Sequence, residues 1–194
     1  VDIIDLLGRD PVPPVQHLLA KNIKDKVVMV TGAGGSIGSE LCRQIIKNQP
    51  SKLIIYELTE FALYSIDKEL RLHSNIEIIP ILGSVLEQAK LERVIEQYTV
   101  QTVYHAAAYK HVPLVECNPI AGLKNNAVGT AFSVNAAVKK GVETFVLIST
   151  DKAVRPTNVM GASKRMAELY CQAMAAAQQK TQISIVRFGN VLGS

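Results

Sequence analysis

The sequence predicts an α/β protein in which a doubly wound parallel sheet carries helices on both faces. Short apolar runs rich in β-branched residues alternate with longer amphipathic stretches. Strands that are covered on both faces need such continuous apolar runs, and helices are the usual cover. The expected strands span 27–30, 53–56, 76–81, 102–105, 145–149 and 184–188, and the expected helices span 37–48, 60–72, 87–97, 119–140 and 158–179.

Length and composition favour one folded domain. The chain has 194 residues, of which 48% are hydrophobic and 20% charged, as in ordinary soluble domains. A net charge of +4 without long basic runs argues against a nucleic-acid partner. No apolar run approaches the roughly 20 residues of a membrane span. Cys42, Cys117 and Cys171 show no metal-binding spacing, so we expect reduced, mostly buried thiols and no metal site.

Residues 1–22 differ from the rest in composition, because they hold three of the eight prolines and little periodicity. We interpret them as a linker or lead-in segment, followed by one domain over 23–194. The sequence begins without methionine and ends at Ser194 directly after an apolar run. We therefore expect it to be a fragment of a longer protein.

A glycine-rich turn follows the first expected strand in the stretch "VTGAGGSIGSEL". Gly32, Gly35 and Gly38 stand at three-residue spacing, and Ser36 and Ile37 lead into a helix. In this context the glycines permit a tight turn, close approach of a diphosphate, and close packing of helix on strand. The amino terminus of the helix then attracts the diphosphate. The pattern predicts a Rossmann-type dinucleotide-binding domain rather than an ordinary glycine turn.

Other residues at strand ends are expected to complete the cofactor site. Glu57 ends the second strand, where an acid binds the adenosine ribose; its charge disfavours a 2′-phosphate, so we predict NAD rather than NADP. A helix-capping role is the alternative for Glu57. Ser84, followed by Val85, stands where related folds place an acid against the adenine. Small side chains after the fourth strand would let the backbone pass under the cofactor, namely Ala106, Ala107 and Ala108.

Five stretches together resemble the extended short-chain dehydrogenase/reductase superfamily, from about Lys26 to Ser194. They are "TGAGGSIGSE", "HAAAYKHVPLVE", "NNAVGT", "STDKAVRPTNVMGASKRMAE" and "VRFGNVLGS". More narrowly, they resemble the CapD-type nucleotide-sugar 4,6-dehydratases of polysaccharide biosynthesis. Met160 stands at the usual catalytic tyrosine position, as in the large, membrane-attached subfamily.

This resemblance implies a dehydratase that uses NAD and a UDP-sugar, namely UDP-N-acetylglucosamine. Hydride would leave C4, water would be eliminated across C5 and C6, and hydride would return to C6, giving a 4-keto-6-deoxy sugar for capsule, O-antigen or other surface polysaccharide. It also implies a homo-oligomer, and a cytoplasmic domain whose parent is held in the bacterial inner membrane by a preceding region. A carboxy-terminal substrate region would follow residue 194, so we expect this chain alone to bind NAD without turnover.

The resemblance also assigns site residues. Asp151 and Lys152 match the acid/base pair of dehydratases, and Lys164 matches the lysine that holds the nicotinamide ribose. A thioether has no proton to exchange, so Met160 cannot act as the base, and Asp151 or Lys152 would deprotonate the C4 hydroxyl. Lys110 and Asn190 are expected to bind substrate.

Neighbouring polar residues have weaker claims. His105 is expected to be a structural histidine, and His111 remains a weak site candidate. Asn126 matches an asparagine that steadies the central strands, with a surface amide as the alternative, and Arg187 is expected to anchor a strand end.

Two other functions remain open from the sequence. An NAD-dependent UDP-sugar epimerase would share the cofactor motifs, but the Asp151–Lys152 pair argues against it because an epimerase eliminates no water. A non-catalytic dinucleotide sensor would suit Met160 but would leave Asp151, Lys152 and Asn190 without a role. The group that takes the C4 proton stays open.

Overall fold

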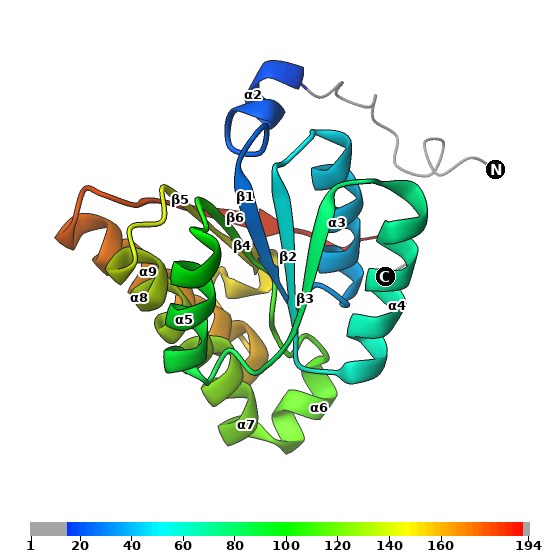
Figure 1. Cartoon of the computed structure of the whole chain (residues 1–194). Coiled ribbons are helices and arrows are strands. Elements are labelled where there is room, and N and C mark those ends of the chain that lie inside the picture. The colour runs from blue at the N-terminus through cyan, green and yellow to red at the C-terminus, as the bar shows by residue number, and fades with distance from the viewer. Residues whose placement is uncertain (1–14, 192–194) are drawn as a thin grey trace.

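A six-stranded parallel sheet organises the chain in the computed structural model, which describes residues 15–191 (Figure 1). The strands run in the order β3-β2-β1-β4-β5-β6, so the order reverses between β1 and β4, as in a doubly wound fold. The predicted fold class is therefore confirmed. The strands are β1 (Val27–Thr31), β2 (Lys52–Glu57), β3 (Glu77–Leu82), β4 (Thr102–His105), β5 (Thr144–Thr150) and β6 (Gln182–Phe188).

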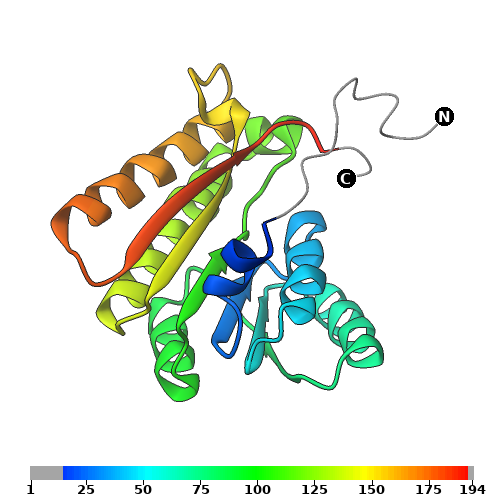
Figure 2. The same cartoon turned by 90° about the horizontal axis from the view of Figure 1, so that it is seen from above.

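Helices cover both faces of this sheet (Figure 2). Helices α3 (Ser36–Lys47) and α4 (Glu60–His73) lie on one face, and α5 (Gln88–Tyr98), α8 (Gly129–Lys139) and α9 (Val159–Ala177) lie on the other. Alternate residues of each strand therefore enter different cores. In β1, Val28 and Val30 pack in the α3 and α4 core, while Met29 packs in the opposite one.

The stretch expected as one helix over 119–140 is divided. It consists of α7 (Pro119–Leu123), a π-helical turn η1 (Lys124–Val128) and α8. A π turn inserts an extra residue into the helix and changes which side chains face inward. Here Asn125 and Asn126 in η1 are both buried. A helical period alone does not show such an insertion, so sequence periodicity predicted an unbroken helix.

Two short helices were not expected. Helix α2 (Gln16–Lys21) lies within the segment interpreted as a linker, and α6 (Val112–Cys117) follows β4. Six residues show less than two turns of periodicity, so neither helix stands out in the sequence. Residues 1–14 of the expected linker lie outside the described residues. One thiol also differs from expectation, because Cys117 at the end of α6 is exposed while Cys42 and Cys171 are buried.

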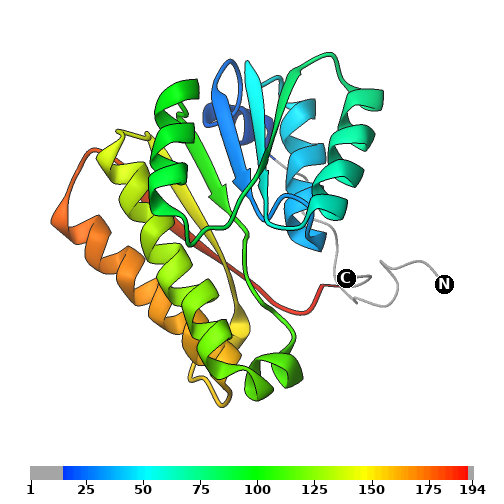
Figure 3. The same cartoon turned by 60° about the horizontal axis from the view of Figure 1, so that its bottom comes forward.

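The loops that follow the parallel strands gather at one edge of the sheet (Figure 3). The segments after β1, β4, β5 and β6 meet there, around the point where the strand order reverses. Ligands of doubly wound folds bind in this crevice. Among residues 15–191, no helix has the length and apolarity needed to cross a membrane.

Candidate functional site

The glycine-rich loop between β1 and α3 forms a tight backbone cradle. Gly32 has a φ of +69°, and a Cβ on it would lie 2.6 Å from the Cα of Ala107. A Cβ on Gly38 would lie 2.0 Å from the Gly32 carbonyl oxygen, whereas one on Gly35 would meet only that oxygen at 3.4 Å. Gly32 thus makes the turn and Gly38 the close packing, while the open side of Gly35 fits a diphosphate.

A smaller cavity of about 260 Å³ opens beside this cradle, at the end of β2. Glu57 lies in its wall and also binds backbone: Oε2 accepts from the Gly34 N–H at 2.9 Å, and Oε1 accepts from the N–H groups of Leu58 at 2.9 Å and Thr59 at 3.1 Å. A capping residue accepts from N–H groups inside the first turn of a helix. The N–H groups of Leu58 and Thr59 come before α4, so the alternative role of Glu57 as a helix cap is not seen. These backbone N–H groups hold its carboxylate at the wall of the smaller cavity.

Ser84 lies in the turn that follows β3, as expected, but it is not among the residues that line either cavity. Its hydroxyl accepts from the Leu86 N–H at 3.1 Å, and its own N–H donates to Glu87 at 2.8 Å. The side chain is therefore used in the turn that leads into α5, because a serine hydroxyl readily bonds to backbone two residues on. Gly83 and Val85 line the smaller cavity in its stead.

The three alanines after β4 run under the crevice as expected. Ala106, Ala107 and Ala108 all line the smaller cavity, and Ala106 and Ala108 also reach the larger one. The backbone of Ala107 lies so close to Gly32 that a side chain on Gly32 would force the two segments apart. The small side chains thus bring the β1 and β4 loops together.

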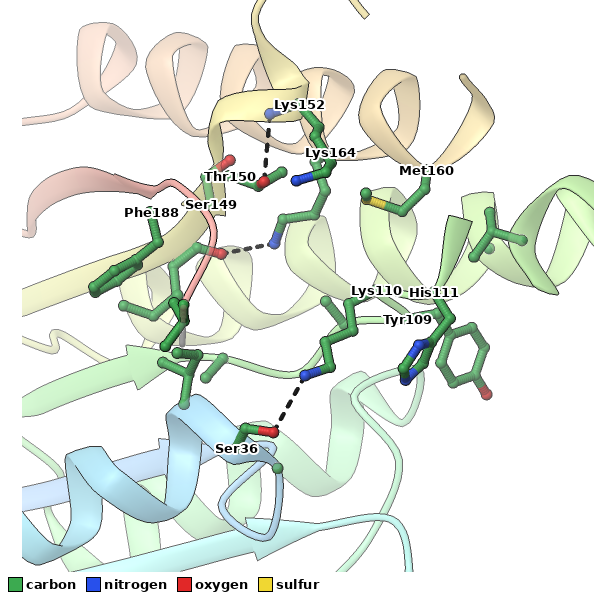
Figure 4. Close-up of a pocket in the computed structure, with 18 of the residues that line it drawn as sticks. Ser36, Tyr109, Lys110, His111, Ser149, Thr150, Lys152, Met160, Lys164 and Phe188 are labelled. Carbon is green, nitrogen blue, oxygen red and sulfur yellow. Dashed lines mark hydrogen bonds between the residues drawn. The ribbon is translucent and has the colours of Figure 1, made fainter. Parts of the chain in front are cut away.

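A larger cavity of about 810 Å³ continues from the glycine loop toward α9 (Figure 4). Its wall contains Lys110, Lys152, Met160, Lys164 and Asn190, and Ser36, Ile37 and Gly38 close its glycine end. Sequence reasoning missed other lining residues, because apolar and loop positions carry no chemical signature. These are Tyr109, Leu114, Val115, Asn118, Ala121, Gly122, Ile148, Ser149, Thr150, Phe188, Gly189 and Val191.

Lys164 and Met160 share one face of α9 at the larger cavity. Both are almost fully buried, with 4% and 3% exposure respectively. The Lys164 ammonium donates to the Ile148 carbonyl at 2.7 Å. Burial lowers the pKa of Lys164 to about 8, against the opposing effect of Glu168 and Cys171. Lys164 is therefore fixed by the Ile148 carbonyl, and Met160 beside it has no proton to exchange.

Asp151, Lys152 and Asn190 meet at the mouth of this cavity. Lys152 Nζ donates to Asn190 Oδ1 at 3.0 Å and to Asp151 Oδ1 at 3.3 Å. A hydrogen bond from the Thr150 hydroxyl, with further help from Lys152, lowers the pKa of Asp151. The predicted pair does not point the same way: Lys152 and Asn190 line the cavity, whereas Asp151, 54% exposed, stands at its rim.

Lys110 lies at the glycine end of the same cavity. Its ammonium donates to the Ser36 hydroxyl at 3.2 Å, at the amino terminus of α3. In Figure 4 it extends toward Ser36, across the cavity from Lys152 and Lys164. This position suits contact with a phosphate more than with a sugar ring. His111 also lines the cavity.

His105 is a structural residue, as expected, and its tautomer follows from its partners. Thr130 donates its hydroxyl proton to the Asn126 carbonyl at 2.7 Å, so its oxygen accepts from His105 Nε2 at 3.0 Å. His105 Nδ1 then accepts from Thr31 at 2.7 Å. Burial, and the positive charge of Lys164, lower the pKa of His105 to about 3. The ring is neutral and does not reach either cavity wall.

Asn126 and Arg187 also hold structure together. Asn126 is buried, accepts from the Tyr109 N–H at 2.8 Å, and donates to the Tyr109 carbonyl at 3.0 Å and to Ser163 at 2.9 Å. It ties the loop after β4 to α9, so the surface-amide alternative is wrong. Arg187 binds Glu168 rather than lining the cavity, as expected of an anchor. Sequence reasoning missed Glu168, although it follows Lys164 by one helical turn.

Comparisons with known proteins agree with this architecture. Residues 28–194 match the family described as polysaccharide biosynthesis protein. The capsular polysaccharide biosynthesis protein CapD of Staphylococcus aureus is 47% identical over 196 residues, covering 100% of this chain and 33% of that protein. A UDP-N-acetylglucosamine 4,6-dehydratase (inverting) of Campylobacter jejuni is 35% identical over 175 residues, covering 87% of this chain and 50% of that protein.

Among solved structures, the UDP-glucose-4-epimerase of Stenotrophomonas maltophila, crystallised with NAD and formylated UDP-arabinopyranose, superposes with a TM-score of 0.77. It shares 19% identity and covers 84% of this chain and 52% of that chain, a similarity that shows the fold alone. The chain spans between a third and a half of the length of these relatives. The chain belongs to the polysaccharide biosynthesis protein family, within the extended short-chain dehydrogenase/reductase superfamily.

Proposed function

We propose that this chain is the dinucleotide-binding region of an NAD-dependent nucleotide-sugar 4,6-dehydratase that acts on UDP-N-acetylglucosamine. The product would be a UDP-linked 4-keto-6-deoxy sugar used for capsule, O-antigen or another surface polysaccharide. The observation that carries the proposal is the set of Asp151, Lys152 and Asn190, joined by hydrogen bonds at the mouth of the cavity that Lys164 also lines. This set would provide a proton acceptor in Asp151, at the rim of the cavity, and a proton donor in Lys152, in its wall.

The cradle supports NAD as the cofactor. A Cβ at Gly32 or Gly38 would overlap neighbouring backbone, whereas the side of Gly35 is open, so a diphosphate would approach the start of α3 at Gly35. Glu57 would hold the adenosine ribose and repel a 2′-phosphate, and Lys164 would hold the nicotinamide ribose. When bound, NAD supplies the acceptor for the C4 hydride and the donor that returns it to C6.

The side chains would then move protons. Oxidation at C4 releases a hydroxyl proton, elimination removes the C5 proton and the C6 hydroxyl as water, and reduction restores hydrogen at C6 and C5. The ionised Asp151 can accept a proton, and the ammonium of Lys152 can donate one to the departing hydroxyl. Asn190 would orient Lys152 through their hydrogen bond.

Met160 limits where the C4 proton can go. The thioether faces the cavity but cannot accept or donate a proton. We propose that Asp151 or Lys152 accepts the C4 proton, directly or through water, while Lys164 stabilises the alkoxide. The Lys164 ammonium is already held by the Ile148 carbonyl at the cavity wall, which suits a role in binding the alkoxide rather than in taking its proton.

The mass of the product tests the proposed reaction. A full-length protein containing this region should convert UDP-N-acetylglucosamine to a species lighter by one water. An unchanged mass with altered stereochemistry would show the epimerase instead, and dinucleotide binding without any conversion would show the sensor. The epimerase alternative has the shared fold in its favour, but it gives Asp151 and Lys152 no task.

Two substitutions in the full-length protein would locate the base. Asp151→Asn should reduce kcat by about 10² to 10⁴ if the carboxylate takes a proton in the rate-limiting step. Met160→Tyr would restore a phenol at the usual position and tests whether a second base adds to the rate. A fully active Asp151→Asn enzyme would exclude Asp151 and leave Lys152 as the acceptor.

The remaining parts of the assignment concern the whole protein. We propose that the sugar nucleotide's base is held by a region following this one, so that this chain binds NAD without turnover. We also propose a homo-oligomer whose catalytic domain lies in the cytoplasm and is attached to the bacterial inner membrane through a preceding region. Robust dehydration by the 194-residue chain alone would contradict the first of these proposals.

A further inference from the structure

Glu168 is a fully buried acid on α9 that the proposed chemistry does not use. Its Oε1 accepts from the Ser149 hydroxyl at 2.7 Å and from Arg187 Nε at 2.8 Å. Its Oε2 accepts from Arg187 Nη2 at 2.7 Å and from Arg165 Nη1 at 3.0 Å. All four contacts are directional, and the two from Arg187 form a bidentate pair, the geometry that fixes a guanidinium most firmly.

The partners of Glu168 lie on neighbouring strands of the sheet. Ser149 and Arg187 are register partners in the parallel pair formed by β5 and β6. Ser149 comes just before the turn that carries Lys152, and Arg187 comes just before the segment that carries Asn190. One carboxylate on α9 therefore holds both strands at the point where they deliver residues to the cavity.

Glu168 also acts on Lys164, which precedes it by one turn of α9: burial lowers the pKa of Lys164, and the negative charge of Glu168 opposes that effect. The groups around the Lys164 ammonium are Glu168 and Cys171 from α9, neutral His105 from β4 and the Ile148 carbonyl from β5. Burial raises the pKa of the Cys171 thiol to about 12, so Cys171 is uncharged at neutral pH. Burial opposes ionisation of Glu168, but hydrogen bonds from Arg187, Ser149 and Arg165 lower its pKa to about 2.

We propose that Glu168 is a positioning residue that fixes the ends of β5 and β6 against α9, so that Lys152 and Asn190 stay in the wall of the cavity that Lys164 also lines. Its negative charge keeps the buried Lys164 in the ammonium form. The inference rests on the proposed function for the roles of Lys152 and Asn190. Its test reads the geometry and protonation of the site directly, so its failure and that of the dehydratase assignment are distinguishable.

Titration of Lys164 by NMR of lysine-labelled protein tests the electrostatic part, with the signal assigned by its loss in Lys164→Met. Glu168→Gln should move the Lys164 midpoint to lower pH by about one pH unit, because a nearby opposite charge is removed. Arg187→Gln should move it to higher pH, because Glu168 keeps its charge and loses a compensating cation. A purely structural role would lower the melting temperature in both variants without moving either midpoint, and would overturn the proposal.

Amide hydrogen exchange tests the geometric part. Exchange at Phe188 and Gly189 should accelerate by at least about tenfold in Glu168→Gln and Arg187→Gln, because the end of β6 loses its anchor. Glu168→Asp should retain the Lys164 midpoint but not the slow exchange. Glu96→Gln, which breaks the surface pair with Lys140, is the matched control and should change neither.

Either variant can decide the matter if the other does not fold. A folded Glu168→Gln with unchanged midpoint and exchange would overturn the inference. So would a folded Arg187→Gln whose Lys164 midpoint falls or stays in place.

Discussion

The glycine end of the cleft and its α9 end are held in different ways. At the glycine end the backbone itself forms the wall. Gly32 lies against the backbone of Ala107 and Gly38 against that of Gly32, so closely that a Cβ on either glycine would overlap it. At the α9 end the wall depends on buried charge, with Lys164 bonded to a carbonyl and Glu168 to two arginines. The first arrangement is sensitive to added volume, and the second is sensitive to altered charge and to pH.

The largest effect is expected from added volume at the glycine end. Gly38→Ala would place a Cβ 2.0 Å from a backbone oxygen, which should cost about 3 kcal/mol or more in the free energy of unfolding, because backbone cannot move aside as a flexible side chain can. Gly35→Ala, with its nearest contact at 3.4 Å, should change that free energy by less than about 1 kcal/mol. Urea unfolding of both variants measures the difference, and equal losses would show that the cradle is not packed as described.

Removing a charge at the α9 end should give the next largest effect, and that effect should depend on pH. The pKa of Lys164 is about 8 in the folded protein and about 10.5 in the unfolded chain, so the unfolded state binds more protons between these values. The wild type should therefore gain stability relative to Lys164→Met as the pH rises through this window, by on the order of 3 kcal/mol.

Urea unfolding of both proteins from pH 7 to pH 10.5 measures this gain. Lys152→Met controls for the loss of one positive charge at an exposed position. Stability curves of wild type and Lys164→Met that stay parallel across the window would contradict the burial of a charged Lys164.

A smaller loss of stability is expected when one hydrogen bond of the buried His105 is removed. His105 on β4 bonds Thr31 on β1 and Thr130 on α8. Thr130→Val removes the acceptor of the buried Nε2–H and should lower the free energy of unfolding by about 1 to 3 kcal/mol. Thr130→Ser keeps the hydroxyl and should retain most of that stability. Thermal unfolding compares them, and a Thr130→Val protein as stable as Thr130→Ser would argue against the assigned tautomer.

The smallest effect is expected on cofactor selectivity at the glycine end. Glu57→Gln removes the carboxylate charge that would repel a 2′-phosphate, but it leaves an amide of similar shape. Its preference for NAD over NADP, measured from the two dissociation constants by calorimetry, should fall by about tenfold, or about 1.4 kcal/mol. Glu87→Gln, outside both cavity walls, should leave the ratio alone. An unchanged ratio in Glu57→Gln would remove Glu57 from the ribose site.

The two ends also differ in how far the sequence predicted them. The glycine spacing, the strand before it and the helix after it are local signals, so Gly32, Gly35 and Gly38 could be assigned together. The contact expected of Ser84 rests on its place after β3 alone, and the sequence does not show that its hydroxyl accepts from the Leu86 N–H. At the other end, Lys164 and Lys152 were identified by position, but the outward turn of Asp151 and the contact of Glu168 with Arg187 depend on tertiary packing between segments distant in sequence.

Transfer of a hydrogen label tests the central claim most directly. A full-length protein containing this region would be given UDP-N-acetylglucosamine deuterated at C4, in ordinary water, and the product would be analysed by NMR and mass spectrometry. We expect a product that has lost one water and carries the deuterium in its C6 methyl group, because the hydride that leaves C4 returns to C6. Deuterium found again at an inverted C4, with no water lost, would contradict the dehydratase assignment.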